Sequence, residues 1–201
     1  RLDAAVFEHN VARVRDERLE LANRRYLEVL RGSLLDEHYL ENEVRIRYLL
    51  DCALGGRNVS PEQLRDPETF LHNETRRLRD ARRVGAPVTG HPGSAYFPFM
   101  TMGSVRLDHL DRTLQRIREE EVAGDLVECG TSRGGGAIYM RGFLEAYELS
   151  ERQVWVADRF RATPMNTSAH PLEDGGVENL RADLNQIRSG FARFGLFDER
   201  V

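Results

Sequence analysis

The sequence contains no lysine, and all 29 of its basic Lys and Arg positions are arginine. A Walker A loop needs a lysine that reaches the nucleotide phosphates, and an enzyme that uses pyridoxal phosphate needs a lysine that forms the Schiff base. The absence of lysine therefore excludes both kinds of site from these 201 residues.

Cysteines are scarce and long apolar stretches are missing. Cys52 and Cys129 are the two cysteines, and their separation fits neither a metal site nor a redox pair, which favours a reduced, cytoplasmic setting. No apolar run approaches the roughly 18 residues that a membrane span needs, and the first residues lack a signal-peptide core. The formal net charge of -4 gives no support for a nucleic-acid partner. We expect a soluble protein with neither a membrane nor a nucleic acid as partner.

Residues 1–84 predict a helical N-terminal extension. Apolar residues recur there at helical spacing among charges, and two helix start signals follow. Ser33 with Asp36 resembles a capping box, and Ser60 stands before Pro61, which suits the first position of a helix. The next segment, 85–103, holds three prolines and four glycines and predicts a loop or linker.

In residues 104–201, predicted helices alternate with two short strand patterns. "DLVEC" ends at Cys129 and "QVWVAD" ends at Asp158; both are bounded by polar or glycine-rich segments. Strand, helix, strand and helix in this order predict parallel βαβ units with right-handed crossovers. Because two strands make no stable open sheet, we interpret this part as the beginning of an α/β, Rossmann-like domain and expect further strands after Val201.

The glycine-rich turn "GTSRGGG" follows the first strand and admits three interpretations. A dinucleotide-binding turn has glycine at the middle position of its G-x-G-x-x-G pattern, where this chain has Ser132. A nucleophile elbow, G-x-S-x-G, fits Gly130–Gly134, and Ser132, Asp158 and His170 follow in the order of a hydrolase triad. However, His170 comes too soon after Ser132 for the remaining strands of a hydrolase sheet to lie between them.

The third interpretation is a nucleoside site without a pyrophosphate. Glu128 and Asp158 lie near the ends of the two strands, and parallel strands place both at the carboxyl edge of the sheet, where ligands bind. An acid there can accept hydrogen bonds from ribose hydroxyls, and S-adenosylmethionine has an adenosine and a sulfonium but no phosphate. The structural alternatives are that Asp158 is a cap or turn residue and that Glu128 accepts backbone amides of the turn. In either case Glu128 should hold the shape of the turn, because a buried carboxylate without partners is costly.

The segment "GDLVECGTSRGGGAIYMRGFLEAYELSERQVWVADRF" resembles the core of the macrocin O-methyltransferase family, whose members modify sugars on macrolides and related natural products. "YLEVLRGSLLDEHYLENEVR" and "MTMGSVRLDHL" before it, and "IRSGFARFGLFDERV" after it, also resemble family segments in the expected order. The resemblance implies a class I methyltransferase domain with a helical extension. It implies S-adenosylmethionine as the methyl donor, a glycosylated natural product or nucleotide sugar as the acceptor, and a homo-oligomeric, cytoplasmic enzyme.

The resemblance also implies particular site residues. Glu128, Gly130, Thr131 and Asp158 match motif positions at the cofactor, and Ser132 stands in the same turn where the family usually has an aromatic residue. A second set matches the segment that closes over the methionine part of the cofactor: Thr101, Met102 and Arg106. Such enzymes often use Mg²⁺, whose aspartate ligands we expect beyond residue 201.

The departures from the family pattern leave room for a second function. Arg159 replaces the usual small hydroxyl residue after the second-strand acid, and Ser132 is the other change. A methyltransferase-like subunit without catalytic activity would also fit these residues. For an enzyme, His170 is the candidate base, with a solvated loop histidine as the plain alternative.

Overall fold

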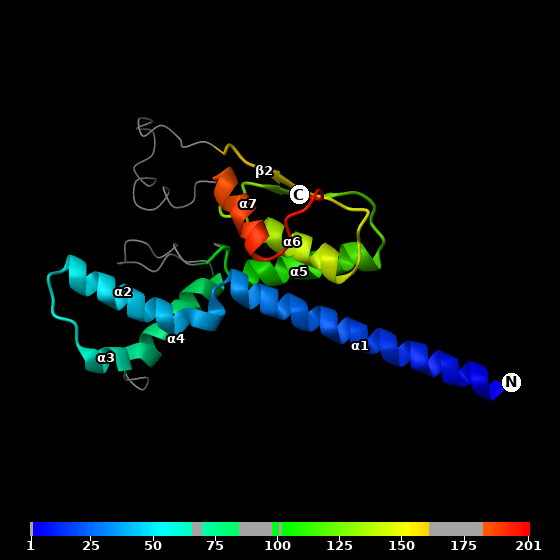
Figure 1. Cartoon of the computed structure of the whole chain (residues 1–201), viewed down its shortest axis with the longest axis horizontal. Helices are drawn as coiled ribbons and strands as arrows, with labels where there is room; N and C mark the ends of the chain where they lie inside the picture. Colours follow the sequence, from blue (N-terminus) through cyan, green and yellow to red (C-terminus); the bar gives the residue numbers. More distant parts are fainter. Residues whose placement is uncertain (1, 66–69, 85–97, 101, 161–182) are drawn as a thin grey trace.

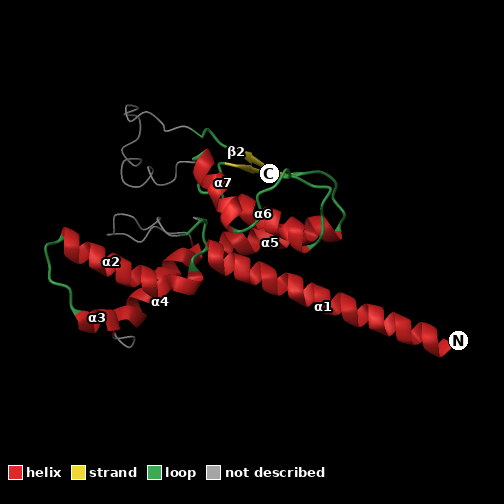
Figure 2. Cartoon of the chain, viewed as in Figure 1, coloured by secondary structure: helices red, strands yellow, loops and turns green. Residues whose placement is uncertain are grey.

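The computed structural model describes residues 2–65, 70–84, 98–100, 102–160 and 183–201. Two helical groups and a small parallel sheet make up this part of the chain (Figures 1 and 2). The helices are α1 (Leu2–Leu34), η1 (Glu37–Tyr39), α2 (Leu40–Leu54), α3 (Pro61–Arg65), α4 (Phe70–Val84), α5 (Ser104–Glu119), α6 (Gly135–Ala146) and α7 (Leu184–Arg193). The strands are β1 (Leu126–Cys129) and β2 (Val154–Ala157).

The helical character predicted for residues 1–84 is confirmed, but one predicted helix start is wrong. Helix α1 continues through Ser33, whose hydroxyl donates to the Val29 carbonyl within the same helix at 2.9 Å. The chain turns only afterwards, where Asp36 has a left-handed φ of 56° and makes no capping hydrogen bond. Ser33 therefore bonds backwards along α1, as serine can do inside a helix, and does not cap a new one. The start at Ser60 is confirmed, because its hydroxyl accepts from the backbone N–H of Gln63 at 3.5 Å.

Two apolar clusters divide the described residues. The larger cluster gathers the end of α1 with α5, α6, α7 and both strands, around side chains such as Leu34, Leu107, Ile138 and Phe191, each at most 1% exposed. The smaller cluster joins α2 and α4 through Leu40, Val44, Leu71 and Leu78. The first part of α1 extends away from both clusters and ends at the N-terminus (Figure 1). The end of α1 thus belongs to the larger core, while α2 and α4 share a small core of their own.

The two strands pair in parallel, as the βαβ pattern predicts. The register places Glu128 opposite Val156 and Cys129 opposite Ala157, so both strands end at the same edge. Helix α6 packs against both strands on one face. On the other face Val127 and Trp155 remain 60% and 57% exposed. The covered face therefore faces the larger core, while the carboxyl edge is free to carry the turn that follows β1.

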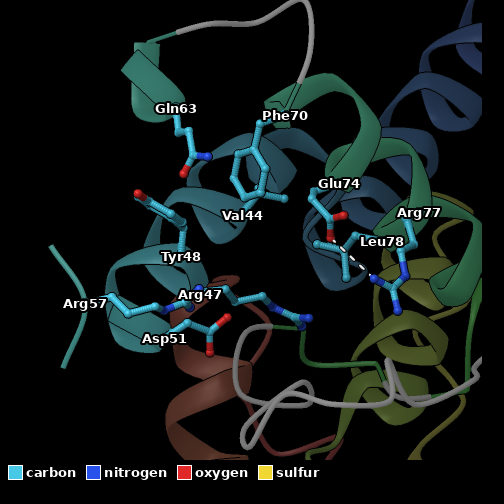
Figure 3. A pocket seen from close by; sticks show the side chains of 10 residues that line it. All are labelled: Val44, Arg47, Tyr48, Asp51, Arg57, Gln63, Phe70, Glu74, Arg77 and Leu78. Carbon is cyan, nitrogen blue, oxygen red and sulfur yellow. Dashed lines mark ion pairs between the residues drawn. The ribbon is translucent and has the colours of Figure 1, made fainter. Parts of the chain in front are cut away.

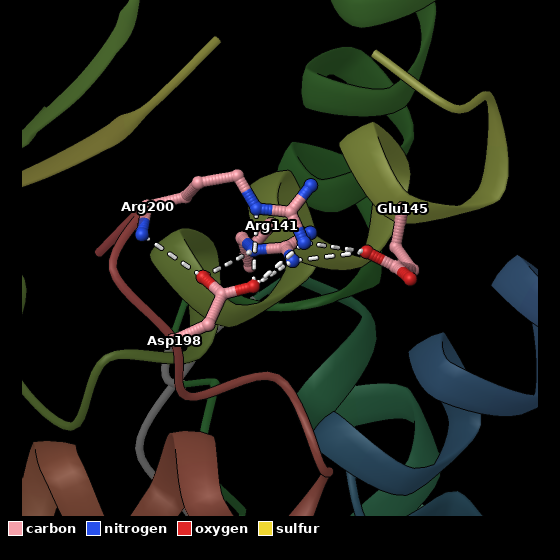
Figure 4. Close-up of polar contacts among 4 residues, drawn as sticks. All are labelled: Arg141, Glu145, Asp198 and Arg200. Atoms are coloured by element: carbon pink, nitrogen blue, oxygen red, sulfur yellow. Dashed lines mark hydrogen bonds and ion pairs between the residues drawn. The ribbon is translucent and has the colours of Figure 1, made fainter. Parts of the chain in front are cut away.

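After α7 the chain returns to the sheet on the side of β2 opposite β1. The carbonyl of Arg200 accepts a hydrogen bond from the N–H of Val154 at 2.8 Å. A group of four charged side chains holds this return in place (Figure 4): Arg141, Glu145, Asp198 and Arg200. Arg141, on α6, is only 1% exposed and donates to Asp198 at 2.5 Å and to Glu145 at 2.9 Å.

The first testable prediction concerns Asp198. Hydrogen bonds from Arg141, and then from Arg200, hold the pKa of the Asp198 carboxyl far below its usual range. The depressed pKa stabilises the fold above the ordinary aspartate pKa of about 4, and this contribution is lost as the pH falls toward the folded-state value. We expect Asp198→Asn to lower the free energy of unfolding by about 1–2 kcal/mol at pH 7, because Arg141 loses its charged partner. In urea titrations the difference from the native chain should shrink progressively below about pH 4; a difference independent of pH would contradict this role.

Among the described residues, no helix is both long and apolar enough to cross a bilayer.

Candidate cofactor site

The glycine-rich turn between β1 and α6 is held in a conformation that few residue types adopt. Gly130, Ser132 and Gly134 have φ angles of 82°, 51° and 85°, all in the left-handed region. Glycine tolerates these angles, whereas Ser132 takes one of them at a conformational cost. The N–H of Gly134 closes the turn by donating to the Thr131 carbonyl at 2.8 Å. The alternation of left-handed residues explains why the turn is rich in glycine.

Glu128 holds the turn against the first turn of α6. Its Oε2 atom accepts from the Thr131 hydroxyl at 2.7 Å and from the backbone N–H of Ala137 at 2.9 Å. The expectation that Glu128 fixes the shape of the turn is confirmed by these two contacts. Gly136 makes room for the carboxylate, because a Cβ atom at this position would lie 2.1 Å from Glu128 Oε1.

Asp158 binds the same turn from the neighbouring strand. Its Oδ2 atom accepts from the backbone N–H of Thr131 at 2.9 Å, and its Oδ1 atom accepts from the N–H of Arg159 at 2.6 Å. Thr131 is only 4% exposed and therefore links the two acids, Glu128 through its hydroxyl and Asp158 through its amide. Each carboxylate oxygen has two lone pairs, so Asp158 retains acceptor capacity for a ligand hydroxyl.

The surroundings of Glu128 change the protonation equilibrium of its carboxyl. Burial raises the pKa of the Glu128 carboxyl above its ordinary value, and the negative charge of Asp158 adds to the rise. The hydrogen bonds from Thr131 and Ala137 act in the opposite direction. A raised pKa means that the charged form is favoured less in the folded protein than in the unfolded chain. Glu128 thus lies in the less hydrated part of the site.

Ser132 contributes an unsatisfied polar atom. Its Oγ atom is buried and has no hydrogen-bond partner among the residues that the structure describes. A buried hydroxyl without a partner costs free energy, and such groups in native proteins call for an explanation. Beside it, Gly130 borders open space, since a Cβ atom there would meet no heavy atom within 4 Å. The turn therefore offers an unused hydroxyl and free room next to the two acids, as a ligand site requires.

The second testable prediction follows from this hydroxyl. We expect Ser132→Ala to raise the free energy of unfolding of the ligand-free chain by roughly 1 kcal/mol, because a buried unsatisfied group is removed. The family resemblance places Ser132 at the cofactor and thus predicts that the same variant binds S-adenosylhomocysteine, the demethylated form of S-adenosylmethionine, about fivefold more weakly, because a hydrogen bond to the ligand would be lost. Urea unfolding and calorimetry measure the two effects. Because alanine keeps a Cβ atom, the backbone strain at this φ stays comparable. A variant that is less stable than the native chain and binds S-adenosylhomocysteine normally would refute the proposed role of the Ser132 hydroxyl.

The other predicted site residues differ in their burial, and two of them are not described by the structure. Met102 is partly buried against the core, and its Cε atom would lie 3.3 Å from a Cβ atom at Gly136, so it lies beside Glu128. Arg106 is exposed in the first turn of α5. Thr101 and His170 lie outside the described residues, as does most of the predicted linker.

Sequence reasoning missed three residues that shape this site. Gly135 packs against the segment before α5, where a Cβ atom would lie 2.6 Å from the Phe99 carbonyl oxygen. Arg133 donates to the Pro98 carbonyl at 3.2 Å and ties the turn to the same segment. Together with Gly136 against Glu128 and the left-handed φ of Gly134, each position of the run "GGG" has its own reason for glycine, and the run itself was the signal.

Metal ligands do not assemble in the part of the chain that the structure describes. There, no group of three or more His, Cys, Asp or Glu side chains could hold a metal ion. The described residues thus offer no ligand set for the Mg²⁺ that the family resemblance implies.

The fold and the turn define a class of protein. Two parallel strands, a glycine turn that opens a helix, and an acid near the end of each strand are the arrangement found at the ligand-binding edge of Rossmann-like domains.

Comparison with known proteins gives the family within this class. Residues 23–201 match the family model described as Macrocin-O-methyltransferase (TylF). The chain therefore belongs to the macrocin O-methyltransferase family, as the sequence resemblance indicated.

Three curated proteins are similar to parts of the chain. An 8-demethyl-8-(2,3-dimethoxy-alpha-L-rhamnosyl)-tetracenomycin-C 4'-O-methyltransferase from Streptomyces olivaceus is 39% identical over 108 residues, which are 50% of this chain and 41% of the relative. Mycinamicin III 3''-O-methyltransferase from Micromonospora griseorubida is 34% identical over 108 residues, 50% of this chain and 42% of the relative. Demethyldecarbamoylnovobiocin O-methyltransferase from Streptomyces niveus is 30% identical over 147 residues, 67% of this chain and 51% of the relative. The matched regions thus span about half the length of these relatives.

A solved structure confirms the fold. The structure of the O-methyltransferase NovP superimposes with a TM-score of 0.58 at 24% sequence identity, over 89% of this chain and 62% of that chain. The predicted fold class, a Rossmann-like methyltransferase domain with a helical extension, is therefore correct.

Proposed function

We propose that this chain belongs to an S-adenosylmethionine-dependent O-methyltransferase that methylates a hydroxyl group of a glycosylated natural product. The observation that carries the proposal is the linkage of Glu128 and Asp158 through Thr131 at the carboxyl edge of the sheet. Family membership supports the reaction, and the names of the three relatives support a glycosylated acceptor.

The residues of the turn fit S-adenosylmethionine. The carboxylate of Asp158 would accept hydrogen bonds from the ribose hydroxyls, and the unsatisfied Ser132 hydroxyl would bond to the bound molecule. Glu128 would act through the protein by fixing Thr131 and the amide of Ala137. Met102, beside Glu128, would border the methionine end, and Thr101 and Arg106 are proposed for the same end. Small glycines would let the turn approach the ligand closely.

The cofactor supplies a methyl group that its sulfonium already activates. The protein then has to align the acceptor oxygen with that carbon and to exclude water, and alignment is the largest contribution we assign to it. His170 is our candidate for the base that takes the acceptor proton. The family resemblance also leads us to propose Mg²⁺, with its ligands beyond residue 201. We also propose a cytoplasmic homo-oligomer.

A methyl-transfer assay tests this function. The full-length protein would be incubated with S-adenosylmethionine carrying a labelled methyl group and with a panel of glycosylated macrolide, polyketide and aminocoumarin acceptors, with and without Mg²⁺. Label transfer to an acceptor hydroxyl is expected. Binding of S-adenosylhomocysteine without transfer to any acceptor would favour a non-catalytic methyltransferase-like subunit, for which Ser132 and Arg159 were the sequence signals.

A further inference from the structure

The helical extension contains a cavity of its own, of about 300 Å³. It lies among α2, α3 and α4, and none of the residues at the glycine turn lines it (Figure 3). Its lining consists of Val44, Arg47, Tyr48, Asp51, Arg57, Gln63, Phe70, Glu74, Arg77 and Leu78. The nucleoside site does not use this space, so the cavity needs a separate explanation.

One part of the lining is aromatic and apolar. The rings of Tyr48 and Phe70 pack edge to face, with centroids 5.3 Å apart and an interplanar angle of 62°. Val44 and Leu78, both buried, lie behind them in the small core between α2 and α4. Such a surface favours the flat face of an unsaturated ring over a fully hydrated ion.

A buried ionic network stiffens the opposite side. Glu43 is fully buried and pairs with Arg82 from α4 and with Arg47 from α2. Arg82 also donates to the Leu35 carbonyl at 3.0 Å, which joins α4 to the end of α1. Burying these charges costs free energy, and their ion pairs and hydrogen bonds offset part of it. The same contacts fix the positions of α2 and α4. Arg47 therefore reaches the cavity from a rigid base.

The polar groups of the cavity that remain available are mainly donors. The guanidinium of Arg57 and the carboxamide of Gln63 have no hydrogen bond or ion pair within the described ranges. The Tyr48 hydroxyl accepts from the N–H of Ser60 at 2.8 Å, which leaves its own proton to donate. Of the two acids in the lining, Glu74 faces Arg77 at 3.7 Å and Asp51 already has a partner. Both carboxylates of the lining are therefore engaged, whereas Arg57 and Gln63 can still donate to a bound ligand.

We propose that this cavity binds a small planar aromatic carboxylate. The ring would lie against Tyr48 and Phe70, and the carboxylate would accept from Arg57, whose planar guanidinium suits a two-point contact. A volume near 300 Å³ lies at the lower end of small-molecule sites and suits a single-ring compound. This proposal does not depend on methyl transfer.

Calorimetry on the full chain with benzoate and its neutral analogue benzamide tests the proposal. Benzoate should bind saturably, and benzamide about tenfold more weakly, because it lacks the charge that Arg57 recognises. Arg57→Gln should weaken benzoate about tenfold and leave benzamide unchanged, whereas Phe70→Leu should weaken both. Arg65→Gln is the matched control, since Arg65 is exposed on α3 and does not line the cavity. Thermal melts would show that each variant remains folded.

Three results would overturn the proposal. The first is no saturable benzoate binding up to about 10 mM, a range that includes even weak specific sites. The second is benzoate affinity that Arg57→Gln leaves unchanged. The third is displacement of benzoate by saturating S-adenosylhomocysteine, which would place benzoate at the glycine turn. Benzoate binding in a protein that transfers no methyl group would support this cavity and refute the proposed function, so the two failures are distinguishable.

Discussion

Replacing Asp158 by alanine is expected to weaken the binding of S-adenosylhomocysteine by about 100-fold, or roughly 2.7 kcal/mol, as measured by calorimetry. Two effects combine in this loss. The carboxylate that would accept from the ribose hydroxyls disappears, and charged hydrogen bonds of this kind contribute about 1.5–3 kcal/mol each. The N–H of Thr131 also loses its acceptor, so the turn is held less firmly.

Asp125 provides a matched control at the other end of the sheet. Its carboxylate also bridges the two strands, accepting from the N–H of Gln153 at 3.0 Å and from the indole N–H of Trp155 at 2.9 Å. Asp125→Ala should therefore lower stability by removing similar bonds while leaving ligand affinity unchanged. Equal affinities for the Asp158 and Asp125 variants would show that Asp158 only shapes the protein, and the cofactor site as drawn would be wrong.

A large effect on folding is also expected from Gly136→Ala. The new Cβ atom would lie 2.1 Å from Glu128 Oε1, well inside any permitted contact. Either α6 or the Glu128 side chain must move, and movement of Glu128 breaks its bonds to Thr131 and Ala137. We expect a loss of about 2–4 kcal/mol in the free energy of unfolding, in the range of overpacking combined with a broken buried polar contact.

A double-mutant cycle identifies the cause of this loss. Glu128→Ala removes the obstructing carboxylate, so adding Gly136→Ala to it should cost little more than Glu128→Ala alone. Urea titrations of the four proteins measure the coupling. Additive losses would mean that the clash with Glu128 is not what makes glycine necessary, and that the requirement lies in the neighbouring contact with Met102.

Local chemistry explains how much of this arrangement the sequence could predict. The two strands, with Glu128 near the end of the first and Asp158 at the end of the second pattern, could be predicted from short apolar runs that are bounded by acids and, after the first, by a glycine turn. The role of Glu128 was readable because a buried carboxylate must find donors. In contrast, the capping box proposed at Ser33 was wrong, because a serine hydroxyl can bond within its own helix as well as at a new start.

Other features depend on contacts between distant segments. The cavity of the extension requires Arg57 and Phe70, which are separated in the sequence, to line one space, and no local sequence pattern predicts this. The position of Gly135 against Phe99 likewise depends on where the segment before α5 lies. Tertiary contacts of this kind determine which glycines and which arginines of this sequence have a structural or binding role.

The ion pairs described above all use guanidinium groups, including those of Arg82 with Glu43 and of Arg141 with Asp198. Since no side chain in these 201 residues carries a primary amine, reagents that acylate lysine have no side-chain target in them. Amine-directed cross-linkers and dyes would leave every one of these charged contacts chemically intact. Attachment to a carrier through a side-chain amine within these residues would therefore need a lysine introduced on purpose, at a position that the experimenter chooses.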